Sequence, residues 1–302
     1  MTVTTPTTTT AGAAGADAAD GAGSRGGAAA RGRGPAGGGA PGPARGTAPG
    51  RIFASILWRD LMVTARQPWL FLAEALLQPL FILFIFGKVL ADMSYVDPGY
   101  VPLLLPGIVG LTAFISALQA TALPLVMDFS YSKEIEDRLM APVGIRLVAL
   151  EKIVFGAVRG LFAAVLMVPV GILVLGVPWW PLASVPPVLG MLVLGALLGG
   201  ALGLVLGTVV PARRVGVVFG LALTPLMFTA AAQYSLLSLH GLKWFQIVVG
   251  ANPITYVNEG LRDVLLSDVD SVPLGLDALV LAAAIVLAAL VGVRGFTRRA
   301  VD

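Results

Sequence analysis

Six long apolar runs constrain the fold of this chain more than any other feature of its sequence. Each run has about 20 residues, chiefly Leu, Val, Ala, Gly and Phe, and a helix of that length crosses the roughly 30 Å hydrocarbon core of a bilayer. We therefore predict an all-α integral membrane protein with six transmembrane helices. The predicted spans are residues 70–90, 103–127, 153–177, 188–210, 215–234 and 274–293.

The composition agrees with this fold class and excludes several kinds of site. Of the 302 residues, 57% are hydrophobic and 12% are charged, which is about half the charged fraction of soluble domains. The chain has no Cys and a single His, His240, so disulfides, thiolate metal sites and histidine clusters are excluded. Residues 1–50 are rich in Thr, Ala, Gly and Pro without an apolar run, which predicts a disordered tail before a membrane domain at 51–302.

The distribution of lysine and arginine predicts the orientation, because positive charge accumulates on the cytoplasmic side of a membrane. If residue 51 lies in the cytoplasm, the far side receives only Lys243 and Arg262, with Lys88 near the end of a span. An even number of spans then places both termini in the cytoplasm, and we predict a multi-pass protein of the plasma membrane. The positive residues on the predicted cytoplasmic side are Arg51, Arg59, Arg66, Lys133, Arg138, Arg146, Lys152, Arg213, Arg214, Arg294, Arg298 and Arg299.

A densely charged segment, residues 127–150, separates the second and third predicted spans. Ile135, Leu139 and Met140 recur at helical spacing before Pro142 and Gly144 end the pattern, so we predict a short amphipathic helix at the cytoplasmic surface. Such a helix presents fixed charge to a protein partner or serves as a solvated connection between two spans, and the spacing favours neither. Its charged residues are Lys133, Glu134, Glu136, Asp137 and Arg138.

Residues 51–66 form a second amphipathic pattern, ahead of the first span. Ile52, Phe53, Ile56 and Leu57 share one helical face and charged residues share another. This pattern, with Trp58 and Trp69 as anchors, predicts a helix that lies in the membrane interface.

The loop before the last span contains a third amphipathic pattern, residues 251–266. Asn252 is a good N-cap residue and Pro253 suits the first helical position. Apolar residues then repeat at helical spacing, while Glu259, Arg262 and other polar residues occupy the opposite side. Because polar backbone at membrane depth must be buried against protein, we predict short re-entrant helices that close over the outer ends of the spans.

Polar residues within the spans form two stripes. Thr112, Ser116 and Gln119 share a face of the second span, and Thr229 and Gln233 align in the fifth. Such stripes line a solute pathway or hold helices together, and the spacing fits both roles equally.

Glu74 in the first predicted span and Arg159 in the third are ionisable residues that lie away from the span ends. Intramembrane charges are candidates for a functional role. An ion pair between Glu74 and Arg159 that fixes helix packing is an equally good interpretation.

Glycines recur at a spacing of four in the fourth span, at 195, 199, 203 and 207. This spacing makes one helical face smooth enough for the close approach of another helix, and we expect that helix to belong to the same chain. Gly216 and Gly220 repeat the spacing in the fifth span.

Several catalytic and cofactor-binding patterns are missing from the sequence. No P-loop is present, because none of Lys88, Lys133, Lys152 and Lys243 is followed by Ser or Thr. No His, Asp and Glu cluster offers a metal site, and no nucleophile elbow is present. A membrane protein with a charged cytoplasmic segment and no energy source of its own suggests that a separate subunit supplies the energy.

Two stretches carry a resemblance to a known family. The run FSYSKEIEDRLMAPVGIRLVALEKIVFGAVRGL resembles the cytoplasmic loop and third span of ABC-2 type transporter permeases, and NPITYVNEGLRDVLL resembles the segment before their last span. With the six-span layout the resemblance covers residues 51–299. Drug-resistance permeases of the daunorubicin type and nodulation-type oligosaccharide exporters look most similar.

This resemblance implies a non-enzymatic permease subunit that works as a dimer, expected to be a homodimer, with two ATP-binding cassette subunits that carry ATP and Mg²⁺. Residues 132–147 would be the coupling helix, with Lys133, Glu134, Glu136, Asp137 and Arg138 as candidate contacts to the ATPase. The run EIEDRLMAPV departs from the Gly-Thr-Leu-Glu-Arg version of many members. The resemblance also favours a substrate path lined by Thr112, Ser116, Gln119, Thr229 and Gln233, and an outer gate with Asn252, Pro253, Glu259 and Arg262.

The expected function is ATP-driven export of a hydrophobic or amphipathic compound, such as a drug, a lipid or a glycan. An ATP-independent carrier or channel would instead transport without a partner. A membrane-embedded lipid transferase would need clustered acidic residues, and the sequence has none.

Overall fold

The computed structural model describes residues 49–66, 68–97, 99–129, 145–266 and 271–301, all within the compact unit Thr47–Asp302. The described residues form helices and connecting turns, and no strand occurs among them. Residues 1–48 of the predicted tail lie outside these ranges, whereas residues 49 and 50 belong to the first helix. The long helices are α1 (Pro49–Ala65), α2 (Pro68–Phe84), α4 (Tyr100–Met127), α6 (Ile145–Leu175), α7 (Val185–Val209), α8 (Val215–Phe228), α10 (Pro253–Leu265) and α11 (Leu274–Val301).

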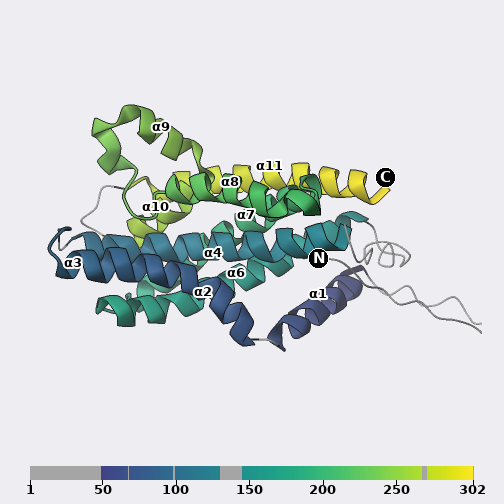
Figure 1. The fold of residues 1–302 in the computed structure, drawn as a ribbon, viewed down its shortest axis with the longest axis horizontal. Helices are drawn as coiled ribbons and strands as arrows, with labels where there is room; N and C mark the ends of the chain where they lie inside the picture. The colour runs from purple at the N-terminus through teal and green to yellow at the C-terminus, as the bar shows by residue number, and fades with distance from the viewer. Residues whose placement is uncertain (1–48, 67, 98, 130–144, 267–270, 302) are drawn as a thin grey trace, which may run out of the picture. The chain divides into compact units, whose positions relative to one another are not determined.

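Shorter elements connect these helices. A π-helical turn, η1 (Ile85–Val89), continues α2 into α3 (Leu90–Asp92), and α9 (Lys243–Ala251) leads into α10. Three 3₁₀ turns complete the described elements: η3 (Leu182–Ser184), η4 (Ala212–Arg214) and η5 (Leu237–Gly241). In Figure 1, α4, α6 and α7 lie side by side, and α1 and α9 lie at opposite ends of the view.

Five described helical segments are long and apolar enough to span a membrane: Phe71–Asp92, Tyr100–Met127, Ile145–Leu175, Leu182–Val209 and Leu274–Arg299. They match five of the six predicted spans and confirm an all-α membrane protein.

The fifth predicted span is shorter than expected, because α8 ends at Phe228 after 14 residues. A helix of that length is only about 21 Å long and falls short of the hydrocarbon thickness. Pro225 lies in its last turn, and Ala231 has a positive φ of 52°, a left-handed conformation that an α-helix cannot contain. The prediction of a continuous helix over 215–234 was therefore wrong at its C-terminal third.

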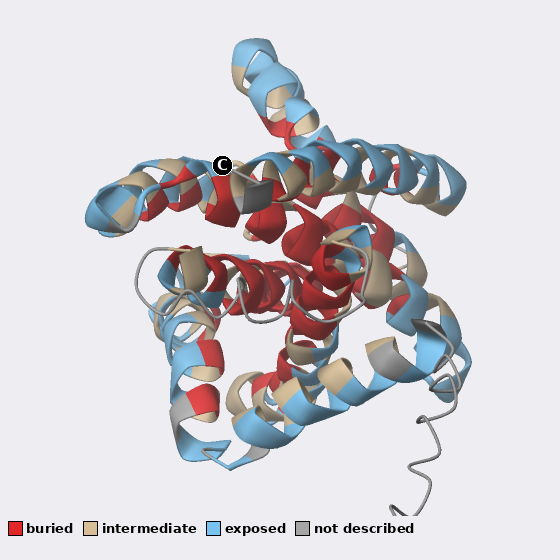
Figure 2. Cartoon of the chain, turned by 90° about the vertical axis from the view of Figure 1, so that its right-hand side faces the viewer, coloured by how far each residue is buried: buried red, intermediate tan, exposed pale blue. Residues whose placement is uncertain are grey.

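Helix α4 forms the centre of the bundle and packs against both α6 and α7. Figure 2 shows buried residues gathered on the central helices, with exposed residues on the outer ones. A Cβ added at Gly199 would collide with the backbone oxygen of Phe114 in α4, and one at Gly203 would approach the oxygen of Leu118. The glycine face of α7 therefore packs within this chain, as predicted.

Two further glycines allow α6 to approach α4 equally closely. A Cβ at Gly156 would meet Thr121, and one at Gly160 would meet the backbone of Ala113. This pair was not predicted, because Gly156 and Gly160 form a single spacing of four and not a series like that in α7. The packing of small residues on both α6 and α7 explains why α4 is the most buried of the candidate spans.

Gly216 and Gly220 differ from the α7 glycines. A Cβ at either position would have nothing within 4 Å, and Val217 and Leu221 beside them are exposed. The prediction that these two glycines mediate a close helix approach is not met among the described residues, because this face of α8 is open.

Helix α1 is present as predicted and is held to α6 by an ion pair. Lys152 Nζ lies 2.9 Å from Asp60 Oδ2, and both side chains are about nine-tenths buried. Trp58 and Trp69 are largely exposed, which is compatible with their predicted role as interfacial anchors.

Candidate functional site

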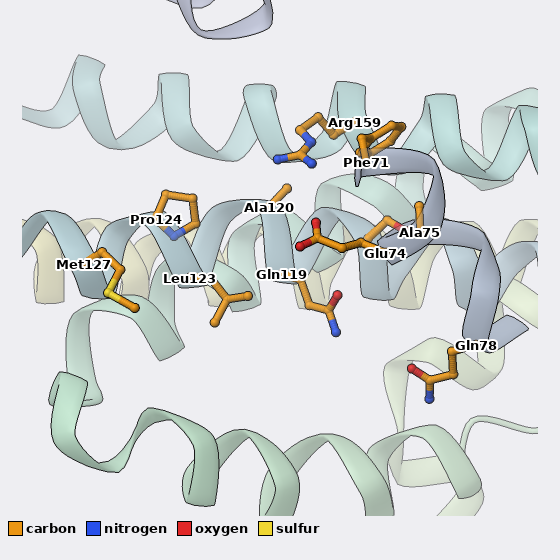
Figure 3. Close-up of a pocket in the computed structure, with 11 residues that line it drawn as sticks. Phe71, Glu74, Ala75, Gln78, Gln119, Ala120, Leu123, Pro124, Met127 and Arg159 are labelled. Carbon is orange, nitrogen blue, oxygen red and sulfur yellow. The ribbon is translucent and has the colours of Figure 1, made fainter. Parts of the chain in front are cut away.

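A cavity of about 380 Å³ lies where α2, α4 and α6 meet. One wall comes from Phe71, Glu74, Ala75 and Gln78 of α2, and Arg159 projects from α6 (Figure 3). Helix α4 supplies the remaining lining residues, which are Ser116, Gln119, Ala120, Leu123, Pro124 and Met127. The cavity therefore has a polar part, which includes Glu74 and Arg159, and an apolar part formed by Leu123, Pro124 and Met127 near the end of α4.

The polar lining follows from helical periodicity. Glu74 and Gln78 are four residues apart on α2, and Ser116 and Gln119 are three apart on α4, so each pair shares one helix face. Three of the five residues predicted to line a substrate path therefore border this region: Ser116 and Gln119 here, and Thr112 in a small adjoining pocket. The Thr112 hydroxyl donates to the backbone oxygen of Ile108 at 2.7 Å.

Arg159 is positioned by aromatic side chains and not by a direct ion pair. Its guanidinium carbon lies 4.7 Å from the ring centroid of Phe71 and 5.9 Å from that of Phe155. Its Nε is buried and has no hydrogen-bond partner among the described residues. Such stacking on ring faces is favourable for a partly desolvated guanidinium.

Glu74 and Arg159 line the same cavity, into which Figure 3 shows both side chains directed. Among the described residues, however, no carboxylate oxygen of Glu74 lies within the 4.0 Å of an ion pair with Arg159. The alternative interpretation, a direct pair that fixes helix packing, is not what the structure contains.

Thr229 and Gln233 lie outside the cavity. Thr229 is the residue after α8, and its hydroxyl donates to the oxygen of Pro225 at 2.9 Å while accepting from Asn252 at 2.9 Å. The two residues were expected to share a helix face, but the helix ends before either of them. The contribution of α8 to the region is Met227, which lines the adjoining pocket.

A second polar cluster lies where α10 meets the end of α8. Asn252 caps α10 by accepting from the amide of Ile254 at 3.0 Å, which confirms the predicted N-cap with Pro253 after it. The same side chain donates to the oxygen of Leu226 at 2.8 Å. Asn258 donates to the oxygen of Ala230 at 2.6 Å, so α10 satisfies backbone oxygens that α8 leaves unpaired at its end.

Glu259 and Arg262 complete this cluster, which we call the α10 network: Asn252, Thr255, Asn258, Glu259 and Arg262. Glu259 accepts from the hydroxyl of Ser235 and the amide of Leu236 at 3.2 and 3.1 Å. Arg262 donates to the oxygens of Ala232 and Leu103 at 3.0 and 3.3 Å. Burial lowers the pKa of Arg262 from its ordinary value, and the charge of Glu259 opposes that decrease.

Helix α10 is amphipathic, as predicted, and both of its sides are buried. Ile254, Val257 and Leu261 on the apolar side and Asn258 and Arg262 on the polar side are all fully buried. The polar side contacts the backbone of residues 226–236, which the sequence analysis assigned largely to a regular span. Gly107 was the missed signal, because a Cβ there would collide with the oxygen of Ala232.

The predicted coupling residues Lys133, Glu134, Glu136, Asp137 and Arg138 lie outside the described residues. Both flanks of their segment are described. Phe129, on one flank, packs on Phe296 with ring centroids 5.5 Å apart, and Arg299 lies 4.8 Å above its ring. Arg299 also donates to the oxygen of Thr208 at 2.8 Å, so it joins this flank to the end of α7.

No group of three His, Asp or Glu side chains suited to a metal comes together in the described ranges. The sequence model of the ABC-2 type transporter family matches residues 51–266. Comparison with curated proteins gives no match.

Proposed function

The chain belongs to the ABC-2 type transporter family, and we propose that it exports an amphipathic compound with energy from a separate ATP-binding cassette subunit. The family assignment makes the chain the membrane component of a transporter, not a catalytic domain. The match extends from residue 51 in α1 to residue 266 after α10, and this observation carries the proposal.

The segment between α4 and α6 is the proposed docking site for the ATPase. It contains Lys133, Glu134, Glu136, Asp137 and Arg138, and its flanks are joined to different parts of the bundle. The first flank contacts α7 and α11 through Phe129 and Arg299, and the second begins α6. Because the same α6 carries Lys152, which holds α1, motion at this segment would reach several helices together.

The orientation and assembly are parts of the same proposal. Arg213, Arg214, Arg298 and Arg299 lie at helix ends on the side of the bundle where α4 ends and α6 begins, and we propose that this side is cytoplasmic. Two permease copies and two ATPase copies would form the working unit, in which ATP and Mg²⁺ bind to the ATPase alone. ATP binding would tilt the two permease halves and switch the cavity between the two sides of the membrane.

The test is substrate-linked ATP hydrolysis by the complex purified from its native membrane. We expect the double variant Glu136→Lys with Asp137→Lys to insert normally but to lose stimulation, because reversed charge opposes docking. Asp97→Lys is the matched control, since Asp97 is exposed in the loop at the opposite ends of the helices. Unchanged coupling in the double variant would overturn the docking assignment.

An ATP-independent carrier or channel is the competing function. It would transport in vesicles that contain the purified chain alone, and it would tolerate the same charge reversal. Recovery of the chain with a near-stoichiometric ATPase, together with transport that requires ATP, excludes that alternative.

A further inference from the structure

The cavity between α2, α4 and α6 combines two opposite charges that do not form a direct ion pair. Glu74 of α2 and Arg159 of α6 both line it (Figure 3). Gln78, Ser116 and Gln119 add neutral hydrogen-bonding groups to the same lining. Both charged residues belong to candidate membrane spans. Charged residues at membrane depth are costly, and they are therefore candidates for a ligand site or a pathway.

The geometry of Arg159 leaves a defined part of the guanidinium available. Phe71 lies against the guanidinium at 4.7 Å, and a stacked guanidinium still presents its N–H groups at the edge. Those N–H groups match the two oxygens of a phosphate or carboxylate. Nε is buried without a partner among the described residues, so stacking does not satisfy this donor.

Glu74 provides the complementary charge. Its side chain is exposed and lines both the main cavity and the adjoining pocket, so a ligand cation can reach it. A singly charged ligand would neutralise one of the two residues and leave the other without a close counter-charge. A ligand that carries both charges would neutralise both.

We propose that this cavity binds the zwitterionic head group of an amphipathic ligand, with its anionic group at Arg159 and its ammonium group at Glu74. This inference rests on the proposed function, since it specifies the substrate class of the exporter. The neutral side chains of Gln78, Ser116 and Gln119 bind the remaining polar atoms. The apolar part of the ligand lies along Leu123, Pro124 and Met127, which form the other end of the same cavity.

The test compares three probes with the same dodecyl chain: dodecylphosphocholine, dodecyl phosphate and dodecyltrimethylammonium. Equilibrium binding of radiolabelled dodecylphosphocholine to the full chain in an uncharged maltoside detergent is measured, with the other two probes as competitors. We expect the zwitterion to bind about tenfold more tightly than either probe that carries charge of one sign only, because both charge-assisted contacts form only with the zwitterion. Equal affinity for all three probes would overturn the proposal.

Two variants shift the preference in opposite directions. Glu74→Gln is expected to weaken zwitterion binding and to leave dodecyl phosphate as an equally good ligand, whereas Arg159→Gln favours dodecyltrimethylammonium. Matched controls are Asp92→Asn, an exposed carboxylate at the other end of the helical segment Phe71–Asp92, and Arg146→Gln, an exposed arginine of α6. Unfolding cannot produce opposite shifts, and a uniform loss for all probes in Glu74→Gln would contradict the site.

Competition also identifies the source of the head group. Displacement by phosphatidylcholine but not by glycerophosphocholine indicates a membrane lipid, and displacement by both indicates a free zwitterionic solute; each result supports the zwitterion site. Binding is measured without an ATPase, so the two proposals fail separately. If the chain discriminates head groups but has no ATPase partner, the head-group site stands and the proposed transport function fails. If the chain has an ATPase partner but does not discriminate head groups, the transport function stands and the site fails.

Discussion

Glu259 and Arg262 form an ion pair of 2.8 Å in which neither side chain has any exposed surface. The two residues lie one helical turn apart in α10. Arg262 also donates hydrogen bonds to the oxygens of Leu103 at the start of α4 and Ala232 after α8. It therefore connects three segments that are distant in sequence. A buried pair of this kind is stable only when its remaining donors and acceptors are also satisfied.

Removing one member of this pair is expected to be strongly destabilising. Arg262→Met leaves Glu259 buried without its counter-charge, and the expected loss is about 3–5 kcal/mol of unfolding free energy. Thermal unfolding in detergent measures it. The control is the double variant Glu259→Leu with Arg262→Met, which removes both charges and should lose less. A double variant that is less stable than the single one would contradict the assignment of the cost to an unpaired charge.

Asn252→Ala removes two functions of one side chain. It deletes the N-cap of α10, worth about 1 kcal/mol, and the hydrogen bond to Leu226 that completes the end of α8. We expect an unfolding loss of about 2 kcal/mol. Gln246→Ala is the control, because it deletes a single bond to the oxygen of Leu236 and should cost about 1 kcal/mol. Equal losses in the two variants would show that the link to α8 contributes nothing.

Identical glycine substitutions should have opposite effects in α7 and α8. Gly199→Ala places a Cβ against the backbone oxygen of Phe114, and such overpacking typically costs about 1–3 kcal/mol. Gly220→Ala adds a Cβ in open space and should stabilise α8 by about 0.5–1 kcal/mol. The midpoint of thermal unfolding distinguishes them. A loss at Gly220 as large as that at Gly199 would indicate a second copy packed on α8.

Asp60→Asn should release α1 from α6. The variant weakens the buried 2.9 Å pair with Lys152 and leaves a lysine that is nine-tenths buried beside Glu151 alone, at 3.8 Å. Since the chain has no Cys, a single cysteine at Leu61 reports the detachment through faster maleimide labelling. Asp92→Asn, which alters an exposed pair with Lys88, is the matched control and should leave the labelling rate unchanged.

Local chemistry made some features predictable. Asn252 followed by Pro253 specified the start of α10, because a cap residue and a proline act within one helical turn. Gly195, Gly199 and Gly203 specified a close helix contact, because their spacing alone creates the smooth face. The five confirmed spans were predictable for a similar reason, since length and apolarity act within a single segment.

Features that depend on several segments were not predictable in the same way. The end of α8 was misplaced because residues 229–234 are apolar enough for a span. Their backbone oxygens instead accept hydrogen bonds from the side chains of Thr255, Asn258 and Arg262. Ser116 and Gln119 line one cavity with Glu74 and Arg159, although no sequence spacing connects these residues. Thr229 and Gln233, which were predicted to line the same path, lie outside that cavity.

The sequence by itself determined that this chain crosses a membrane as helices, where five of those helices lie, and how α10 begins, because each of these depends on residues within one segment. Only the tertiary structure decided which polar side chains share the cavity and which support the backbone of another segment. The physical reason is that a polar group buried in a membrane protein must be satisfied by whatever donor, acceptor or charge lies closest in space, and that neighbour is set by the packing of α4 against α6, α7 and α10.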